Sequence, residues 1–409
     1  MNILVLTSVY PPLGYSGHDE RCRQTVNGLA RRGHRLQVLT SDHRLPPVGG
    51  LKEKGIYRQL CLYEDSYQED RLGVAYAVTH AHESYNGQCL EARVRSFKPD
   101  VVLVWNMRGL SKSLLFRLQN RGIPLVFDLH ADWIAPEYFE NDPWFRWWFN
   151  NPSFKSAAYQ KFLRWFGLRR GQAGLLPIQH ADGLDLSHSY LCSESLRETL
   201  LSGGIEGVRG LPVIYPFADE SLLSPKVNYR KRMHFMWAGR VSQSKAPDLA
   251  IEAVRLLRER GIEVRLDIFG LGEQAERKAL REEIQKMGLG DLIQMKGIRP
   301  GELRVHFANY DALLFTSRND DPFPMTVLEA MLSRLPCILS RTGGIPEMVG
   351  DSGHVVLFER DDVNALVSAI QHFWSIERDW PQMAEGCIQS LRAVGSFDHI
   401  VRHMESLPA

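Results

Sequence analysis

The feature that most constrains the fold is a repeated alternation of short apolar runs and helical segments. Residues 3–6 (Ile-Leu-Val-Leu) are apolar at every position, as in a strand buried on both faces of a parallel sheet. A helical pattern follows at 21–32 and is closed by Gly33. Further strand-like runs lie at 36–39, 101–104 and 125–127, with helical patterns at 70–97 and near 111–121. Strands that alternate with helices form right-handed βαβ units in a doubly wound sheet.

The same alternation begins again after a break near residues 212–228. The second set of strand-like runs lies at 235–237, 264–269, 293–295, 312–316, 337–339 and 355–357. Helical patterns lie at about 247–260, 273–288, 301–309, 325–333 and 362–375, and a last one at about 397–406. A chain of 409 residues is too long for one ordinary core. We therefore predict an α/β protein with two Rossmann-like domains, 1–220 and 221–385, facing each other across a cleft. A C-terminal helix, 386–409, is predicted to cross back to the first domain.

The composition excludes several classes of function. A formal net charge of +1 provides no overall field for nucleic acid, and the six cysteines include no C-x-x-C pair, which favours free thiols in a reducing compartment. No apolar run reaches the ~20 residues of a membrane span. The opening run, residues 1–7, is typical of a first strand and not of a signal peptide. These observations predict a cytoplasmic protein.

Residues 144–171 differ from the rest of the chain because they are rich in aromatic and basic residues and contain no acidic one. Aromatic packing under a lid, with the basic residues on its solvated side, is the simpler explanation. The alternative is an interfacial helix that contacts anionic lipid, since basic, aromatic-rich amphipathic segments can lie in a membrane surface. On that alternative the protein is peripheral to the inner face of the membrane.

Two loops that follow predicted strands have features of phosphate sites. Residues 14–17 (Gly-Tyr-Ser-Gly) let the backbone approach a phosphate at a helix N-terminus, although a plain turn explains them equally well. They do not form the G-x-G-x-x-G fingerprint of dinucleotide-binding proteins. In the second loop Gly239 permits a sharp turn. Arg240 and Lys245 can both reach one diphosphate: the planar guanidinium of Arg240 can donate two parallel hydrogen bonds, and Lys245 offers a compact positive charge. The alternative for these two is a pair of solvated surface cations.

Two further loops carry acidic residues. In residues 318–331, Asp321 lies in the loop and Glu329 on the helix that follows, an arrangement that suits the hydroxyls of a ribose or a sugar. The alternative is that Asp321 caps the helix and Glu329 is a surface acid. Residues 342–347 form another glycine turn, which ends in Glu347.

This combination resembles the retaining, nucleotide-sugar-dependent glycosyltransferases of family 4 (glycosyl transferases group 1), which have the GT-B fold. The resemblance covers nearly the whole chain and is most specific in the C-terminal half. The residues that carry it are Pro11 and Pro12 with the glycine loop to Gly17, Arg32 to His34, Gly239, Arg240, Lys245, residues 269–272 (Phe-Gly-Leu-Gly), Asp321 to Glu329, Gly343, Gly344 and Glu347.

The resemblance implies a role for each matching position. Gly17 and Gly239, with Arg240 and Lys245, would hold the donor diphosphate, and Glu329 would bind the nucleotide ribose. Asp321 would lie near the donor sugar. The backbone N–H groups of Phe323, Met325 and Thr326 would face sugar hydroxyls or phosphate. His130 matches a family histidine beside the reacting sugar, although any single histidine is more often a core or capping residue. The catalytic set is thus His130, Asp321, Arg240 and Lys245.

The resemblance also implies transfer with retention and without a metal, and the sequence has no Asp-x-Asp motif. We expect a UDP-sugar donor, with GDP as the second choice, and a glycan, lipid-linked sugar or small molecule as acceptor. Three positions depart from the family pattern: Asp321 replaces Glu, and Pro324 and Arg334 replace Gly. Pro324 cannot donate a backbone hydrogen bond, so these positions bear on donor choice and on activity.

Three other functions are alternatives to the transferase. A nucleotide-sugar 2-epimerase shares the fold, but Gly239, Arg240 and Lys245 favour transfer. A catalytically weak nucleotide-sugar-binding protein has only the three departures in its support. An NAD-dependent dehydrogenase lacks its fingerprint.

Overall fold

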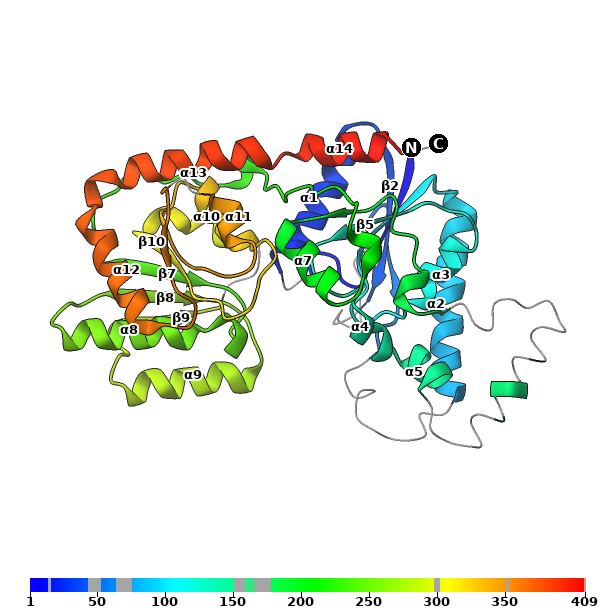
Figure 1. The fold of residues 1–409 in the computed structure, drawn as a ribbon, viewed down its shortest axis with the longest axis horizontal. Coiled ribbons are helices and arrows are strands. Elements are labelled where there is room, and N and C mark those ends of the chain that lie inside the picture. The colour runs from blue at the N-terminus through cyan, green and yellow to red at the C-terminus, as the bar shows by residue number, and fades with distance from the viewer. Residues whose placement is uncertain are drawn as a thin grey trace.

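The computed structural model describes residues 1–13, 16–42, 53–63, 76–150, 158, 160–162, 165, 178–297, 302–350 and 353–407. Within these residues the chain forms two six-stranded parallel sheets, each with helices packed on it (Figure 1). The predicted fold class, two Rossmann-like halves, is confirmed.

The N-terminal sheet has the order β3-β2-β1-β4-β5-β6. Its strands are β1 (Asn2–Thr7), β2 (Arg35–Ser41), β3 (Ile56–Leu60), β4 (Val101–Asn106), β5 (Leu125–Leu129) and β6 (Tyr190–Leu191). Its helices are α1 (Gly17–Arg31), α2 (Tyr76–Phe97), α3 (Ser113–Gln119), α4 (Pro136–Glu140), α5 (Pro143–Phe149) and α7 (Glu194–Ser202). The strand order reverses direction between β1 and β4, and ligands bind at the carboxyl ends of strands beside such a switch point.

The C-terminal sheet has the order β12-β11-β10-β7-β8-β9, so its switch point lies between β7 and β10. Its strands are β7 (His234–Ala238), β8 (Arg265–Phe269), β9 (Ile293–Lys296), β10 (Ala312–Phe315), β11 (Cys337–Ser340) and β12 (Val356–Phe358). Its helices are α8 (Pro247–Glu259), α9 (Gln274–Lys286), α10 (Met325–Leu332), α11 (Ile345–Val349) and α12 (Val363–Ser375). Strand β10 at the switch point is apolar at all four positions, and all four residues are buried, because both faces of the sheet are covered.

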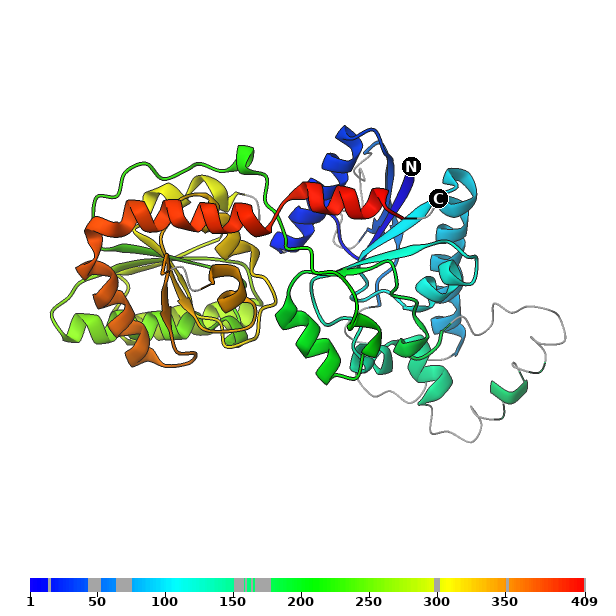
Figure 2. The same ribbon diagram turned by 45° about the horizontal axis from the view of Figure 1, so that its top comes forward.

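The chain then returns to the N-terminal half. Helix α13 (Trp380–Val394) packs on α10, and α14 (Phe397–Glu405) packs on α1, beside the two chain ends (Figures 1 and 2). Gly395 separates the helices. It lies so close to the linker between the two halves, residues 212–228, that a Cβ there would be 2.9 Å from the carbonyl oxygen of Pro216. The segment 386–409, treated above as one helix, thus contains the end of α13 and all of α14.

Several local predictions differ from the structure. The expected helix at 301–309 is two short 3-10 turns, Leu303–Val305 and Phe307–Asn309. The prediction missed strands β3 and β6, helices α4, α7 and α11, and the first part of α13. Part of the expected helix 70–97 and much of the segment 144–171 lie outside the described residues. No helix in the described part of the chain is both long and apolar enough to cross a bilayer.

Candidate active site

The two halves meet through elements that follow the carboxyl ends of their strands. The N-terminal turn of α1 lies against that of α10: a Cβ on Gly17 would be 2.7 Å from the Cβ of Met325. Glu347, on α11, accepts hydrogen bonds from the backbone N–H groups of Glu194 and Ser195 at the start of α7. Glycine at position 17 is therefore required for the close approach of two helix N-termini, both of which favour anions.

The loops of the C-terminal half are packed backbone against backbone. A Cβ on Gly270 would lie 2.0 Å from the carbonyl oxygen of Gly239, so the Phe-Gly-Leu-Gly loop after β8 supports the turn after β7. A Cβ on Gly344 would lie 1.9 Å from the carbonyl oxygen of Pro322, and the Gly344 N–H donates to the Asp321 carbonyl at 2.9 Å. These glycines fix the turn that carries Arg240 and the loop that carries Asp321.

The N-terminus of α10 has free hydrogen-bond donors. The backbone N–H groups of Phe323, Met325 and Thr326 donate to no acceptor within the described residues. Pro324 is the N-cap residue, and no side chain caps the helix, so the alternative role of Asp321 as a cap is excluded. The first N–H groups of a helix need partners, which makes this end suited to an anionic or hydroxyl-bearing ligand.

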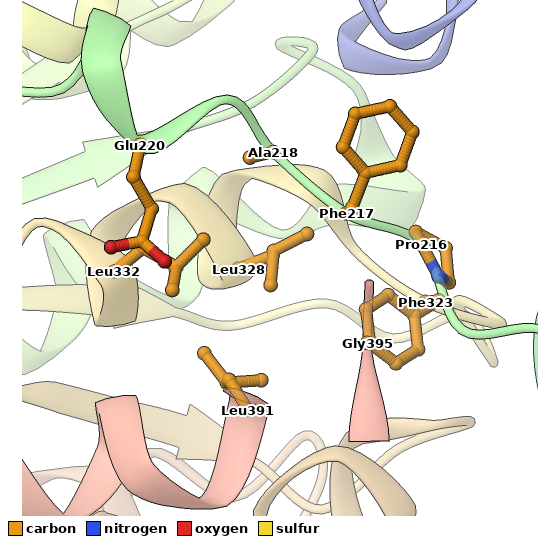
Figure 3. Close-up of a pocket in the computed structure, with 9 residues that line it drawn as sticks. All are labelled: Pro216, Phe217, Ala218, Glu220, Phe323, Leu328, Leu332, Leu391 and Gly395. Atoms are coloured by element: carbon orange, nitrogen blue, oxygen red, sulfur yellow. The ribbon is translucent and has the colours of Figure 1, made fainter. Parts of the chain in front are cut away.

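The side chain of Phe323 points away from these donors. It is 1% exposed and packs on Tyr215 of the linker, with ring centroids 5.7 Å apart. It also lines a cavity of about 30 Å³ between the linker, α10 and α13, together with residues such as Leu328 and Leu391 (Figure 3). Such a cavity can hold water but no nucleotide. Phe323 can thus serve the site only through its backbone.

Asp321, two residues before Phe323 in the same loop, forms an ion pair with Lys245. Lys245 donates from Nζ to Asp321 Oδ1, whereas Oδ2 is buried and has no hydrogen-bond donor within the described residues. A buried carboxylate oxygen without a donor is unusual and calls for a partner, such as a ligand hydroxyl. Arg240 is exposed and forms no ion pair with a described residue, so its guanidinium is available to a ligand.

Glu329 is buried and is not a surface acid. The residue is 6% exposed, and its Oε1 accepts a hydrogen bond from Nε of Arg304 at 3.2 Å. Burial raises the pKa of Glu329, and Arg304 lowers it only in part. Arg304 also donates to Glu20 of α1 at 3.0 Å, so a C-terminal residue links carboxylates from both halves.

His130 follows β5 and is held from two sides. Its Nδ1 lies 3.0 Å from the backbone carbonyl oxygen of Asp128 and 3.2 Å from Asp128 Oδ1, and its ring stacks on that of His18 with centroids 4.6 Å apart. Asp128 is fully buried and pairs with Arg21. Burial raises the pKa of Asp128, but Arg21 and His130 outweigh burial, so the net pKa lies well below the usual value.

His18 connects this group with the C-terminal half. Burial, then the neighbouring His130 and Arg21, lower the pKa of His18 well below its usual value, and Lys245 contributes in the same direction. His18 directly follows Gly17, which lies against Met325 of the C-terminal half. The Nδ1 atom of His18 is enclosed and has no hydrogen-bond partner within the described residues. At neutral pH His18 is therefore uncharged.

The structure thus brings Gly17, His130, Lys245, Asp321 and the N-terminus of α10 together where the halves meet, with Glu329 further along α10. The sequence analysis missed His18, Glu20, Asp128 and Arg304. Only Asp128 had a local signal, a charged residue inside an apolar strand. In the described part of the chain, no group of three or more His, Cys, Asp or Glu side chains is placed to hold a metal ion.

Known proteins resemble both halves of the chain. Residues 16–159 match the family model "Glycosyl transferase 4-like domain", and residues 224–390 match "Glycosyl transferases group 1". The putative colanic acid biosynthesis glycosyltransferase WcaL of Salmonella typhimurium is 32% identical over 148 residues, which are 34% of this chain and 36% of that protein. The chain thus spans about a third of that relative's length. An uncharacterized glycosyltransferase of Methanocaldococcus jannaschii is 22% identical over 85% of this chain and 83% of its own.

Solved structures share the fold over the whole chain. Sucrose-phosphate synthase from Thermosynechococcus elongatus has a TM-score of 0.69 at 16% identity and covers 99% of this chain and 97% of its own. HepE of Anabaena, solved in complex with UDP-glucose, has a TM-score of 0.66 at 17% identity with complete coverage of both chains. The GT-B fold expected from the sequence is confirmed. With glycosyltransferase models matching both halves, the chain belongs to the glycosyl transferases group 1 family.

Proposed function

We propose that the protein transfers a hexosyl group from a nucleoside-diphosphate sugar to a hydroxyl acceptor, with retention of the anomeric configuration and without a metal ion. The observation that carries this proposal is the convergence of two helix N-termini, α1 and α10, beside Lys245 and Asp321. Free backbone N–H groups, fixed cations and an unpartnered carboxylate oxygen are the partners that a diphosphate joined to a polyol requires.

Each part of the donor has a matching group. The ribose is assigned to Glu329. Its Oε2 accepts no hydrogen bond from a described residue and is accessible to solvent. The diphosphate is assigned to Arg240, Lys245 and the backbone at Gly17. The donor sugar is assigned to Asp321 and to the N–H groups of Phe323, Met325 and Thr326. His130, which stacks on His18 next to the N-terminal turn of α1, is assigned to the reacting sugar.

The chemistry follows from these assignments. The bond between the anomeric carbon and the phosphate oxygen breaks while the acceptor oxygen attacks the same face, and the acceptor proton passes to the departing phosphate. Negative charge grows on the phosphate during this step. Fixed cations and helix N–H groups stabilise such charge electrostatically, which removes the need for a bound metal and for a protein nucleophile. Activity that persists in EDTA supports metal independence; loss of activity that Mg²⁺ restores would contradict it.

A panel of nucleotide sugars tests the proposal. The fold neighbour HepE binds UDP-glucose, so UDP-sugars come first, followed by GDP- and ADP-sugars. We expect one of them to be hydrolysed slowly in the absence of acceptor, and Arg240→Ala to abolish most of that activity. Arg281→Ala is the matched control, because Arg281 is exposed on α9 and forms no ion pair with a described residue. Release of an epimerised sugar would instead indicate the epimerase, and equal activity of Arg240→Ala and wild type would refute the site. NMR of the initial product decides between retention and inversion.

Peripheral membrane contact is a separate proposal and concerns the acceptor. Four of the five aromatic residues of α5 are buried, so this helix cannot offer a continuous apolar face. Phe149, Phe162 and Trp165 are 40–54% exposed, and Lys161 is also exposed. Aromatic and basic side chains of this kind suit an anionic bilayer surface and a lipid-linked acceptor. Flotation with anionic vesicles tests it: recovery with the vesicles that Trp165→Ala reduces supports contact, and recovery only in the soluble fraction contradicts it.

A further inference from the structure

Arg304 lies between two carboxylates that belong to different halves of the molecule. It follows β9 and is 4% exposed; Glu20 on α1 is 5% exposed and Glu329 on α10 is 6% exposed. Its Nη2 donates to Glu20 Oε1 at 3.0 Å and its Nε donates to Glu329 Oε1 at 3.2 Å. One planar guanidinium therefore fixes both carboxylates, which a lysine ammonium cannot do in the same geometry.

The two oxygens of Glu329 are not equivalent. Oε1 is held by Arg304, whereas Oε2 has no donor within the described residues and remains open to solvent. The carboxylate is thus anchored through one oxygen and presents the other. A buried carboxylate that is fixed in this way does not need to be reoriented when a hydroxyl group arrives, which lowers the entropic cost of binding.

The anchor itself depends on the N-terminal half. Glu20 is oriented by Arg23, whose Nε donates to Glu20 Oε2 at 3.1 Å. The charges therefore alternate along the path Arg23, Glu20, Arg304 and Glu329. If Glu20 were neutral, Arg304 would lose one of its two anchors, and a buried charge with fewer partners is less well fixed.

We propose that Arg304 is a positioning residue for the donor ribose: it holds Glu329 in the orientation that accepts a ribose hydroxyl, and Glu20 of the N-terminal half holds Arg304. The inference rests on the proposed role of Glu329. It adds a residue of the C-terminal half that acts through Glu329, and it makes the ribose subsite depend on a residue from α1.

Ligands that differ only in the ribose test this inference. The probes are UDP and 2′,3′-dideoxy-UDP, or the GDP pair if the donor panel selects GDP, with affinities measured by calorimetry on the full chain. We expect Arg304→Lys to weaken UDP binding about 10-fold, the size of a lost hydrogen bond to a charged group, and to leave dideoxy-UDP unchanged. Glu20→Gln should weaken UDP binding in the same ligand-selective way, so it replaces Arg304→Lys if that variant does not fold. Asp398→Asn is the control: it removes the ion pair with Arg32, the residue after α1, and this pair has no contact with Glu329, so both ligands should bind as to wild type.

A double-mutant comparison separates the inference from the proposed function. In a Glu329→Gln background, Arg304→Lys should cause no further loss of UDP affinity, because both substitutions disable the same contact. Equal weakening of UDP and dideoxy-UDP, or additive losses, would overturn the positioning role while leaving Glu329 as the ribose residue. If Glu329→Gln alone leaves UDP affinity unchanged, the assigned ribose site is wrong and the inference fails with it.

Discussion

Lys245 pairs with one oxygen of Asp321 and leaves the other oxygen buried without a hydrogen-bond donor in the described part of the chain. The pair lies beside the free N–H groups of α10. It combines a cation for phosphate with an acceptor for a sugar hydroxyl, and this combination is the core of the proposed donor site.

Replacement of Asp321 by Asn should reduce kcat/KM about 100-fold, the usual cost of removing one electrostatic contact in an active site. The amide can still accept a hydrogen bond, but it no longer holds the Lys245 ammonium by charge. Steady-state kinetics with the donor found in the panel measures the effect. Asp320→Asn is the matched control, since Asp320 is 59% exposed and pairs with Arg360 instead. Similar losses in both variants would mean that the loop, and not the Asp321 carboxylate, matters.

An alanine at position 344 should disable the site through the backbone. Its Cβ would lie 1.9 Å from the Pro322 carbonyl oxygen, so the loop that carries Asp321 must move. A displacement of this kind costs about 100-fold in rate when it shifts a positioned group by 1 Å. Gly210→Ala is the control, because a Cβ at Gly210 has no atom within 4 Å. Normal kinetics for Gly344→Ala would show that the tight packing of these loops is dispensable.

His18 should make the protein less stable in mild acid. Its pKa in the folded protein is lowered by burial, then by His130 and Arg21, whereas the unfolded chain binds a proton near pH 6.5. Below that pH the unfolded state binds more protons, so this residue reduces the free energy of unfolding by up to about 1.4 kcal/mol per pH unit until the folded pKa is reached. His18→Gln should remove that part of the slope between pH 6.5 and 5. Urea titrations at several pH values measure it, and an identical slope in wild type and variant would contradict the prediction.

Arg334 is the third departure from the family pattern, and its backbone has a φ of +59°. A residue with a side chain costs about 1–2 kcal/mol in this left-handed region, and glycine does not. Arg334→Gly should therefore raise the free energy of unfolding by about 1 kcal/mol. Arg334→Ala is the control, since it removes the exposed ion pair with Glu385 but keeps the strained backbone. A gain in both variants would mean that the arginine side chain, and not φ, is unfavourable.

The sequence predicted the parts of the fold that depend on local pattern. Strand β10 and residues 3–6 of β1 are apolar at every position. The helix after β10 was predicted to within one residue, whereas α1 begins at Gly17, four residues before its predicted start. Strand β3 was missed because it contains Arg58 and Gln59 and lies at the edge of its sheet. The helix expected at 301–309 became two 3-10 turns, one of which carries Arg304.

The candidate site was only partly accessible from the sequence for a physical reason. Loops after strands, such as those of Gly239 and Asp321, carry local signals of glycine and charge. The contact between Arg304 and Glu20 joins residues 284 positions apart, so no local pattern predicts it. The stacking of His18 on His130 likewise depends on how α1 and β5 pack, and the burial of Glu329 depends on Arg304.

A crystal structure with a bound nucleotide sugar tests the central claim most directly. The account predicts a diphosphate between the N-termini of α1 and α10, within reach of Arg240 and Lys245, with a ribose hydroxyl on Glu329 and the sugar beside Asp321. A donor bound elsewhere, or a bound donor whose ribose makes no contact with Glu329, would contradict it.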